Sequence, residues 1–229
     1  MPEIPSVLTD AEWADFQAWC AALTIPVSPA LRENLGRYRA LLLDWNTRVN
    51  LTRVGNPRAV LIKHFLDSLA VLPHLDFEGP LLDVGSGAGL PGLVLKLARP
   101  GLPVTLVEAR AKKVAFLEEA RRRLGVSGLT ILHQHLEPAD PALGGRFGTV
   151  VSRAFTAPAP FLVLARGFLA SRGRVIAMMG PPRPGEPDPA QTAREQGAGR
   201  AEVVAFSLPE GAGDRRLLVA EWIPAAGST

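Results

Sequence analysis

The stretch LLDVGSGAGLPG, residues 81–92, constrains the fold of this chain more than any other part of its sequence. An apolar run ends at Asp83, and glycine then occupies every second position at Gly85, Gly87 and Gly89. Glycine allows the backbone to turn with positive φ and to approach a ligand closely. A glycine-rich turn between a strand and a helix is typical of a nucleotide site at the carboxyl edge of an open α/β sheet.

The spacing of these glycines favours one class of nucleotide over others. Dinucleotide-binding dehydrogenases use G-x-G-x-x-G, whereas this chain has G-x-G-x-G with an aspartate two residues before the first glycine. The loop also lacks the lysine of a phosphate-binding P-loop. The compact pattern suits a nucleoside that carries an amino-acid tail. A glycine-rich turn without any ligand is the structural alternative.

Glu108 ends the next apolar run, VTLVE, about 20 residues beyond the glycine loop. An acid at this position accepts hydrogen bonds from a ribose diol. Both NAD and S-adenosylmethionine have that diol, so Glu108 alone does not choose between them. A solvated carboxylate at the end of a strand is the structural alternative.

Helical and strand patterns divide the chain into two parts. The first part predicts helices, with a cap at Thr9 or Asp10 for the first helix and the pair Ser28-Pro29 opening the second. From Pro80 onward, β-rich runs alternate with helical runs, which predicts a mostly parallel sheet covered on both faces. The last two predicted strands follow each other without a helix between them, so we expect one antiparallel strand.

The composition limits the class of protein further. The formal charge is +3 and the pI about 9.5, which permits a polyanionic partner without requiring one. Cys20 is the single cysteine, which excludes a disulfide within the chain and fits a reducing compartment. The first ten residues do not resemble a signal peptide, and the sequence contains no stretch of 18 apolar residues that is free of charged residues. We therefore expect a cytoplasmic protein without a membrane span.

Two groups of polar residues in apolar surroundings are candidates for function. Arg153 follows the apolar run TVVS, where a charge is costly unless it is used or paired. It is suited to hold a cofactor carboxylate, an RNA phosphate or the O6 edge of a guanine, with an ion pair to Asp67 or Asp83 as the structural alternative. His64, Asp67 and Ser68 share one helix face, which predicts a buried network that locks this helix onto the sheet or lines a pocket.

Four stretches resemble the RsmG (GidB) family in sequence, order and spacing: WNTRVNLT, KHFLDSL, LLDVGSGAGLPG and VVSRAF. Members of that family are S-adenosylmethionine-dependent methyltransferases that modify N7 of a guanine in 16S ribosomal RNA of the small subunit. The resemblance implies an α/β, Rossmann-like methyltransferase fold with a seven-stranded, mostly parallel sheet and one antiparallel strand. Residues 1–78 are then an N-terminal helical extension packed on the methyltransferase domain, residues 79–229.

The resemblance also implies a cofactor, a partner and a set of site residues. The cofactor is S-adenosylmethionine, and the partner is 16S rRNA or the 30S ribosomal particle. We expect a monomer without a metal, because no histidine has a metal-ligand partner at a plausible spacing. The candidate catalytic residues are Arg153, Asn50, His64 and Asp67. The candidate cofactor-binding residues are Asp83, Gly85, Gly87, Gly89, Leu90, Glu108, Ala109, Leu136, Glu137 and Arg153.

The RNA surface and one departure from the family pattern complete this interpretation. Met179 stands where the family pattern has a lysine before the glycine that ends the fifth strand, which puts that lysine's role in doubt here. A solvated helix face is the structural alternative for the arginine run 121–123. The candidate RNA contacts are Arg32, Arg37, Arg39, Arg48, Arg53, Arg58, Lys63, Lys112, Lys113, Arg121, Arg122 and Arg123.

Three other functions stay open on the sequence alone. One is an S-adenosylmethionine-dependent enzyme that acts on another RNA or on a small molecule. Another is an NAD(P)-dependent oxidoreductase, which the glycine spacing and the antiparallel ending disfavour. The last is a module that binds the nucleoside without catalysis.

Overall fold

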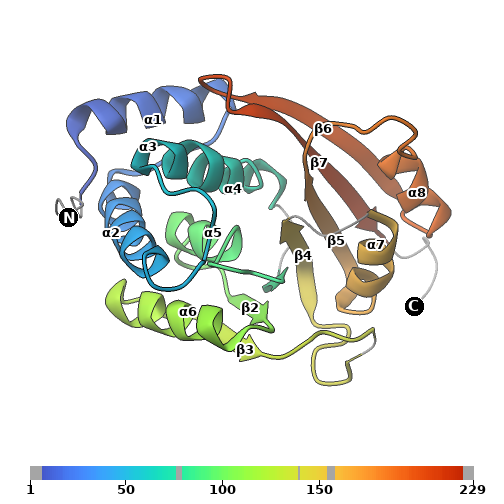
Figure 1. The fold of residues 1–229 in the computed structure, drawn as a ribbon. Coiled ribbons are helices and arrows are strands. Elements are labelled where there is room, and N and C mark those ends of the chain that lie inside the picture. The colour runs from blue at the N-terminus through green and yellow to red at the C-terminus, as the bar shows by residue number, and fades with distance from the viewer. Residues whose placement is uncertain (1–6, 76–78, 139, 154–157, 224–229) are drawn as a thin grey trace.

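A seven-stranded sheet forms the centre of the molecule in the computed structural model, which describes residues 7–75, 79–138, 140–153 and 158–223 (Figure 1). The strand order is β3-β2-β1-β4-β5-β7-β6. Strand β7 runs antiparallel to both of its neighbours, and the other neighbouring pairs are parallel, which confirms the predicted fold class. The strands are β1 (Leu81–Val84), β2 (Val104–Glu108), β3 (Leu129–His133), β4 (Phe147–Arg153), β5 (Leu169–Met179), β6 (Arg200–Leu208) and β7 (Gly213–Trp222).

Helices cover both faces of this sheet (Figure 1). The helical elements are α1 (Asp10–Ala22), α2 (Pro29–Asn46), α3 (Pro57–Val60), the π-helical segment η1 (Leu61–Leu66), α4 (Asp67–Leu69), the 3₁₀ segment η2 (Leu72–His74), α5 (Gly92–Ala98), α6 (Ala111–Arg123), α7 (Pro158–Arg166) and α8 (Pro189–Glu195).

The helix starts follow from local side-chain chemistry. Thr9 accepts a hydrogen bond from the Glu12 N–H at 3.2 Å while the Glu12 carboxylate accepts one from the Thr9 N–H at 2.9 Å, a reciprocal capping box. Ser28 precedes the second helix as predicted, but its side chain makes no capping bond. The sequence predicts one continuous α-helix over residues 58–72, whereas the structure winds its middle as η1, which pattern alone does not reveal.

The strands alternate between two hydrophobic cores. Leu217 and Val219 of β7 face the core that includes α1, α2, α5 and α6, whereas Leu218 and Ala220 face the core with α7 and α8. This alternation is the period of two that a strand imposes on its side chains. The sheet is therefore apolar on both faces, as the near-continuous apolar runs of its central strands predict.

The N-terminal helices share a core with the sheet. Phe16 of α1, Leu42 of α2 and Phe65 of η1 belong to the same cluster as Leu81 of β1 and Leu106 of β2. The predicted boundary between residues 78 and 79 stays a prediction, because residues 76–78 lie outside the described part. No helix in the described part of the chain has the length and apolar character needed to cross a bilayer.

Candidate active site

The glycine loop follows β1 and is held by main-chain hydrogen bonds. Gly85 and Ser86 both donate an N–H to the carbonyl of Val107 in β2, at 2.9 and 3.0 Å, and Gly89 donates to the Ser86 carbonyl at 2.7 Å. The φ angles of Gly85, Gly87 and Gly89 are +71°, +59° and +85°. L-residues with a side chain rarely adopt this conformation, so the loop requires glycine at all three positions.

The glycines of this segment differ in what surrounds them. Among the described residues, a Cβ at Gly85 would meet no atom within 4 Å, and a Cβ at Gly87 would meet only the Lys113 Nζ at 3.6 Å and a loop carbonyl at 3.9 Å. A Cβ at Gly89 or Gly92 would lie 2.8 or 2.4 Å from packed side chains. We call Gly85 and Gly87 the outer glycines and Gly89 and Gly92 the inner glycines. The space above the outer pair fits a ligand that lies against the main chain.

Asp83 lies beneath the loop and has no exposed surface. Its Oδ2 accepts a hydrogen bond from the Gly92 N–H at 2.7 Å, which holds the first turn of α5 against β1. Its Oδ1 has no hydrogen-bond partner among the described residues. Burial raises the pKa of Asp83 to about 7. The arrangement supports a role in holding the loop, and direct contact with a cofactor stays a prediction.

Tyr38 reaches the loop from α2. Its hydroxyl donates a hydrogen bond to the Ala88 carbonyl, and its ring stacks on Phe65 and Phe116 with centroids 5.2 and 6.3 Å apart. The side chain is fully buried, and burial raises the pKa of its hydroxyl above the ordinary value. Tyr38 therefore connects the helical extension to the glycine loop.

Glu108 lies beside the outer glycines, as its place at the end of β2 predicts. Its Oε2 accepts a hydrogen bond from the Gly87 N–H at 2.9 Å, and its Oε1 accepts one from the Arg110 N–H at 2.8 Å. Next to it, the Ala109 carbonyl lies 3.1 Å from His133 Nε2. The carboxylate of Glu108 is thus fixed at the loop, with acceptor capacity left for a ribose diol.

The remaining candidates for cofactor contact differ in exposure. Leu90 is buried in the core beneath the loop, whereas Leu136 is partly buried and packs on the core of the opposite face. Glu137 is exposed in the segment that follows β3. The Leu90 N–H donates to the Ser86 carbonyl at 2.9 Å, so Leu90 is part of the loop itself. Its contact with the cofactor, and the contacts of Leu136 and Glu137 with adenine, stay predictions.

Arg153 ends β4 at the same edge of the sheet. Its Nη2 donates a hydrogen bond to the Lys63 carbonyl at 2.9 Å, and its Nε lies 3.5 Å from Asp67 Oδ2. Its Nη1 is buried and has no partner among the described residues. The ion pair with Asp67 is one of the two pairs that the sequence offers as structural alternatives. The unpartnered N–H nonetheless leaves Arg153 able to donate to a ligand.

His64 joins Arg153 in a buried polar network. His64 Nε2 lies 2.8 Å from Thr52 Oγ1, its Nδ1 lies 3.2 Å from Arg153 Nη2, and Ser68 donates its hydroxyl to the His64 carbonyl at 2.6 Å. Burial and the Arg153 charge lower the pKa of His64 to about 4, so the imidazole is neutral near pH 7. The predicted network is confirmed. Asn50, in contrast, is exposed and makes no hydrogen bond within the described chain.

Comparison with known proteins identifies the family. A family model described as rRNA small subunit methyltransferase G matches residues 31–206. The chain belongs to this family. It is 42% identical over 204 residues to the ribosomal RNA small subunit methyltransferase G of Myxococcus xanthus (strain DK1622), covering 88% of this chain and 93% of that protein. Identity to the protein of the same name from Burkholderia thailandensis is 39% over 205 residues, covering 87% of each.

Solved structures show the same fold at low identity. A SAM dependent methyltransferase from Aquifex aeolicus has a TM-score of 0.55 and 15% identity, covering 76% of this chain and 97% of that one. A methyltransferase from Pyrococcus furiosus also has a TM-score of 0.55, with 14% identity and coverage of 67% and 79%. The Rossmann-like methyltransferase fold predicted for this family member is therefore confirmed.

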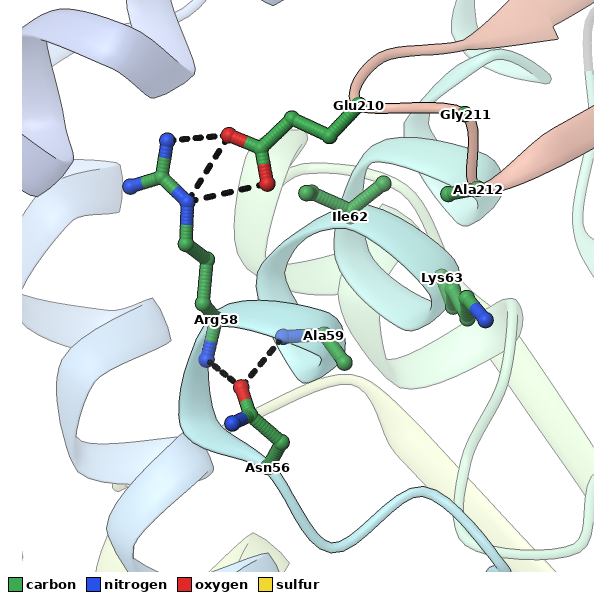
Figure 2. Close-up of a pocket in the computed structure, with 8 residues that line it drawn as sticks. All are labelled: Asn56, Arg58, Ala59, Ile62, Lys63, Glu210, Gly211 and Ala212. Atoms are coloured by element: carbon green, nitrogen blue, oxygen red, sulfur yellow. Dashed lines mark hydrogen bonds and ion pairs between the residues drawn. The ribbon is translucent and has the colours of Figure 1, made fainter.

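Many arginines of this member of the methyltransferase G family are neutralised within the chain. Arg39, a candidate for RNA contact, is instead buried and paired with Glu12, because α1 packs over it. Figure 2 shows Arg58 bound to the Glu210 carboxylate across a pocket between α3 and the turn that joins β6 to β7. Other pairs are Arg32–Asp10, Arg48–Asp44, Arg121–Glu118, Arg122–Glu119 and Arg123–Glu119.

A second set of cations has no such partner. The side chains of Arg53, Lys63, Lys112 and Lys113 make no hydrogen bond or ion pair with the described residues. Figure 2 shows no interaction between the Lys63 ammonium and the seven other residues drawn there. Lys63 neighbours His64 in the Arg153 network, and Lys113 approaches Gly87. The unpartnered lysines therefore include two beside the candidate site.

Two residues of the site are not predicted from the sequence. Tyr38 is the only tyrosine of the chain and lies on the buried face of α2, a signal that marks it as unusual without giving its target. Arg215 lies with its Nε 3.4 Å from Asp67 Oδ1, and no local pattern indicates this contact because it depends on the register of β7. Met179, in place of the expected lysine, lies opposite Arg216 in that register.

Proposed function

We propose that this chain transfers the methyl group of S-adenosylmethionine to N7 of a guanine in 16S rRNA of the small ribosomal subunit. Its membership of the methyltransferase G family supports the class of reaction. The observation that carries the cofactor assignment is the open space above Gly85 and Gly87, next to the fixed Glu108 carboxylate. We also propose that the enzyme acts as a cytoplasmic monomer without a metal.

The residues around the loop fit the parts of S-adenosylmethionine. The main chain at the outer glycines accommodates the nucleoside, Glu108 accepts from the ribose hydroxyls, and Leu136 and Glu137 contact the adenine. Arg153, with its buried unpartnered Nη1, suits the carboxylate of the amino-acid tail. When bound, the cofactor supplies an electrophilic methyl carbon on its sulfonium.

The chain's own task is to position the acceptor and exclude water. Guanine N7 has a free lone pair and no proton to remove, so the reaction needs no general base. The polar groups next to the site agree with this, because Asp67 is engaged by arginines and His64 is neutral inside a hydrogen-bond network. We assign Asn50, His64, Asp67 and Arg153 to shaping the guanine pocket at the carboxyl edge of the sheet.

The unpartnered cations are the proposed contacts with the RNA backbone. Within the described part of the chain, no carboxylate pairs with Arg53, Lys63, Lys112 or Lys113, so none has to be displaced before these cations meet a phosphate. The arginines at the end of α6, in contrast, are already paired. Charge reversal at Lys113 is therefore expected to weaken RNA binding, and charge reversal at Arg122 to have little effect. Recognition of the base itself requires a guanine taken out of its stack.

The deciding experiment is radiolabelled methyl transfer from S-adenosylmethionine onto purified 30S subunits and onto naked 16S RNA, with the modified base mapped. We expect label at N7 of a single guanine. The variant Gly87→Asp serves as the control, because a side chain there enters the proposed cofactor space. Label on another RNA or a small molecule, with ribosomal particles unlabelled, would overturn the proposal.

A further inference from the structure

The Asp67 carboxylate lies between two guanidinium groups. Arg153 Nε is 3.5 Å from one carboxylate oxygen, and Arg215 Nε is 3.4 Å from the other. The Asp67 side chain is only 5% exposed, and that of Arg215 is 21% exposed. One buried acid therefore joins the end of β4 to the start of β7.

The direction of β7 explains why Arg215 lies next to Asp67. Strand β5 lies between β4 and β7, and β7 is antiparallel, so its first residues stand at the carboxyl edge where β4 ends (Figure 1). Side chains alternate along β7, which places Arg215 on the face of Leu217 and Val219, toward the core with η1. Arg216 points to the opposite face and pairs with Glu186 at 2.8 Å.

The three charges depend on one another. Burial raises the pKa of Asp67, and the positive charges of Arg153 and Arg215 both oppose this rise. Burial also lowers the pKa of Arg153, against which the Asp67 charge acts. Removal of Arg215 leaves a single guanidinium to stabilise the buried Asp67 carboxylate, which favours the protonated form of Asp67. A protonated, neutral Asp67 no longer holds the Arg153 guanidinium by charge.

Arg153 also lies close to the glycine loop, because its neighbour Ser152 donates its hydroxyl to the carbonyl of Val84, the residue before Gly85, at 2.8 Å. The charge of Arg153 also opposes the rise that burial causes in the pKa of Asp83. Its remaining N–H group, Nη1, is the one without a partner among the described residues. The orientation of this guanidinium therefore decides whether a donor is available to a ligand at the loop.

We propose that Arg215 is a positioning residue of the methyltransferase site. It holds the Asp67 carboxylate against Arg153, and Asp67 in turn fixes the orientation of the Arg153 guanidinium, whose Nη1 has no partner among the described residues. The inference rests on the proposed function, because it takes Arg153 as the donor to the cofactor. It adds a residue from the last strand, which no pattern near the glycine loop indicates.

The test is calorimetric titration of S-adenosylmethionine into variants of the full chain, with thermal melting as a check on folding. We expect Arg215→Gln and Asp67→Asn each to raise the dissociation constant about tenfold, and the double variant to raise it no further. Arg215→Lys restores the charge without the planar fork, so we expect a rise of only about threefold. Arg216→Gln removes an ion pair from the same strand and leaves the affinity unchanged.

The outcomes separate this inference from the proposed function. Arg153→Ala is measured alongside, and loss of affinity in Arg153→Ala with none in Arg215→Gln overturns the role of Arg215 alone. Unchanged affinity in both overturns that role together with the placement of Arg153 at the cofactor. If Arg215→Gln does not fold, Arg215→Lys decides, and an unchanged dissociation constant in that variant also overturns the inference.

Discussion

The outer and inner glycines stand within eight residues of one another, yet different surroundings require glycine at the two places. At Gly85 and Gly87 the backbone needs a positive φ, and the space beyond is open. At Gly92 the φ is ordinary, and it is the packing of Asp83 and other side chains that excludes a Cβ. One half of the loop is shaped toward a ligand, and the other half toward the interior.

The largest effect is expected where the interior is tightest. In Gly92→Ala the new Cβ would lie 2.4 Å from Leu106 Cδ2 and 2.8 Å from Asp83 Oδ2. We expect the free energy of unfolding to fall by about 3 to 5 kcal/mol, measured by urea denaturation. Gly55→Ala is the control, because nothing lies within 4 Å of its Cβ, and we expect a change below about 1 kcal/mol. Equal losses in both variants would remove the distinction drawn for the inner glycines.

Asp83→Asn tests whether the inner half of the glycine loop is held by a carboxyl group whose pKa is raised, so that its protonated form is favoured in the folded chain. The folded chain binds this proton more tightly than the unfolded chain, because burial raises the pKa from 3.8 to about 7. The wild type therefore loses stability as the pH rises from about 4 to 7. The Asp83→Asn variant does not lose stability in this way, because asparagine has no titrating proton. We expect the stability of Asp83→Asn relative to the wild type to improve by on the order of 3 kcal/mol between pH 4 and pH 8. A difference that is constant with pH would contradict this assignment.

Gly87→Asp tests the outer half. The side chain enters the space proposed for the nucleoside, so we expect the affinity for S-adenosylmethionine to fall at least about 100-fold, or about 2.7 kcal/mol, by calorimetry. The loss of unfolding free energy should be only about 1 to 2 kcal/mol, the penalty of the left-handed conformation. Gly87→Ala has the same backbone penalty without the carboxylate and separates strain from obstruction. Unchanged affinity in Gly87→Asp would refute the placement of the cofactor against the outer glycines.

Tyr38→Phe is expected to have the smallest effect. The variant keeps the stacked ring and removes the hydroxyl that donates to the Ala88 carbonyl, which is then unpaired. We expect a loss of about 1 kcal/mol in unfolding free energy and an affinity for S-adenosylmethionine within about twofold of the wild type. A large loss of affinity without loss of stability would place Tyr38 on the ligand side of the loop. It would contradict the division of the loop into a half that faces the ligand and a half that faces the interior.

Local patterns suffice for most of the fold and for the loop. Alternating strands and helices predict the sheet, and the two consecutive strands at the end of the chain predict the antiparallel β7. The acid at the end of β2 predicts Glu108 next to the loop, where it bonds the Gly87 N–H. Each of these inferences depends only on residues close in sequence and on the geometry of parallel strands.

Contacts across the fold are not available to such reasoning. Arg39 has the same local signal as any helix arginine, and only the packing of α1 over α2 buries it against Glu12. The contact of Arg215 with Asp67 likewise depends on how distant elements meet, and no local pattern in the sequence marks the π-helical turn of η1. Sequence spacing therefore locates the loop, while the partners that hold it come from tertiary structure.

Because Tyr38 is the only residue of its kind in the chain and touches the loop directly, it offers a spectroscopic label that needs no mutation. Biosynthetic replacement of tyrosine by 3-fluorotyrosine places one fluorine nucleus in the whole protein, next to Ala88. Its single ¹⁹F resonance should move when a nucleoside settles on the neighbouring main chain, and stay fixed when only distant arginines are engaged.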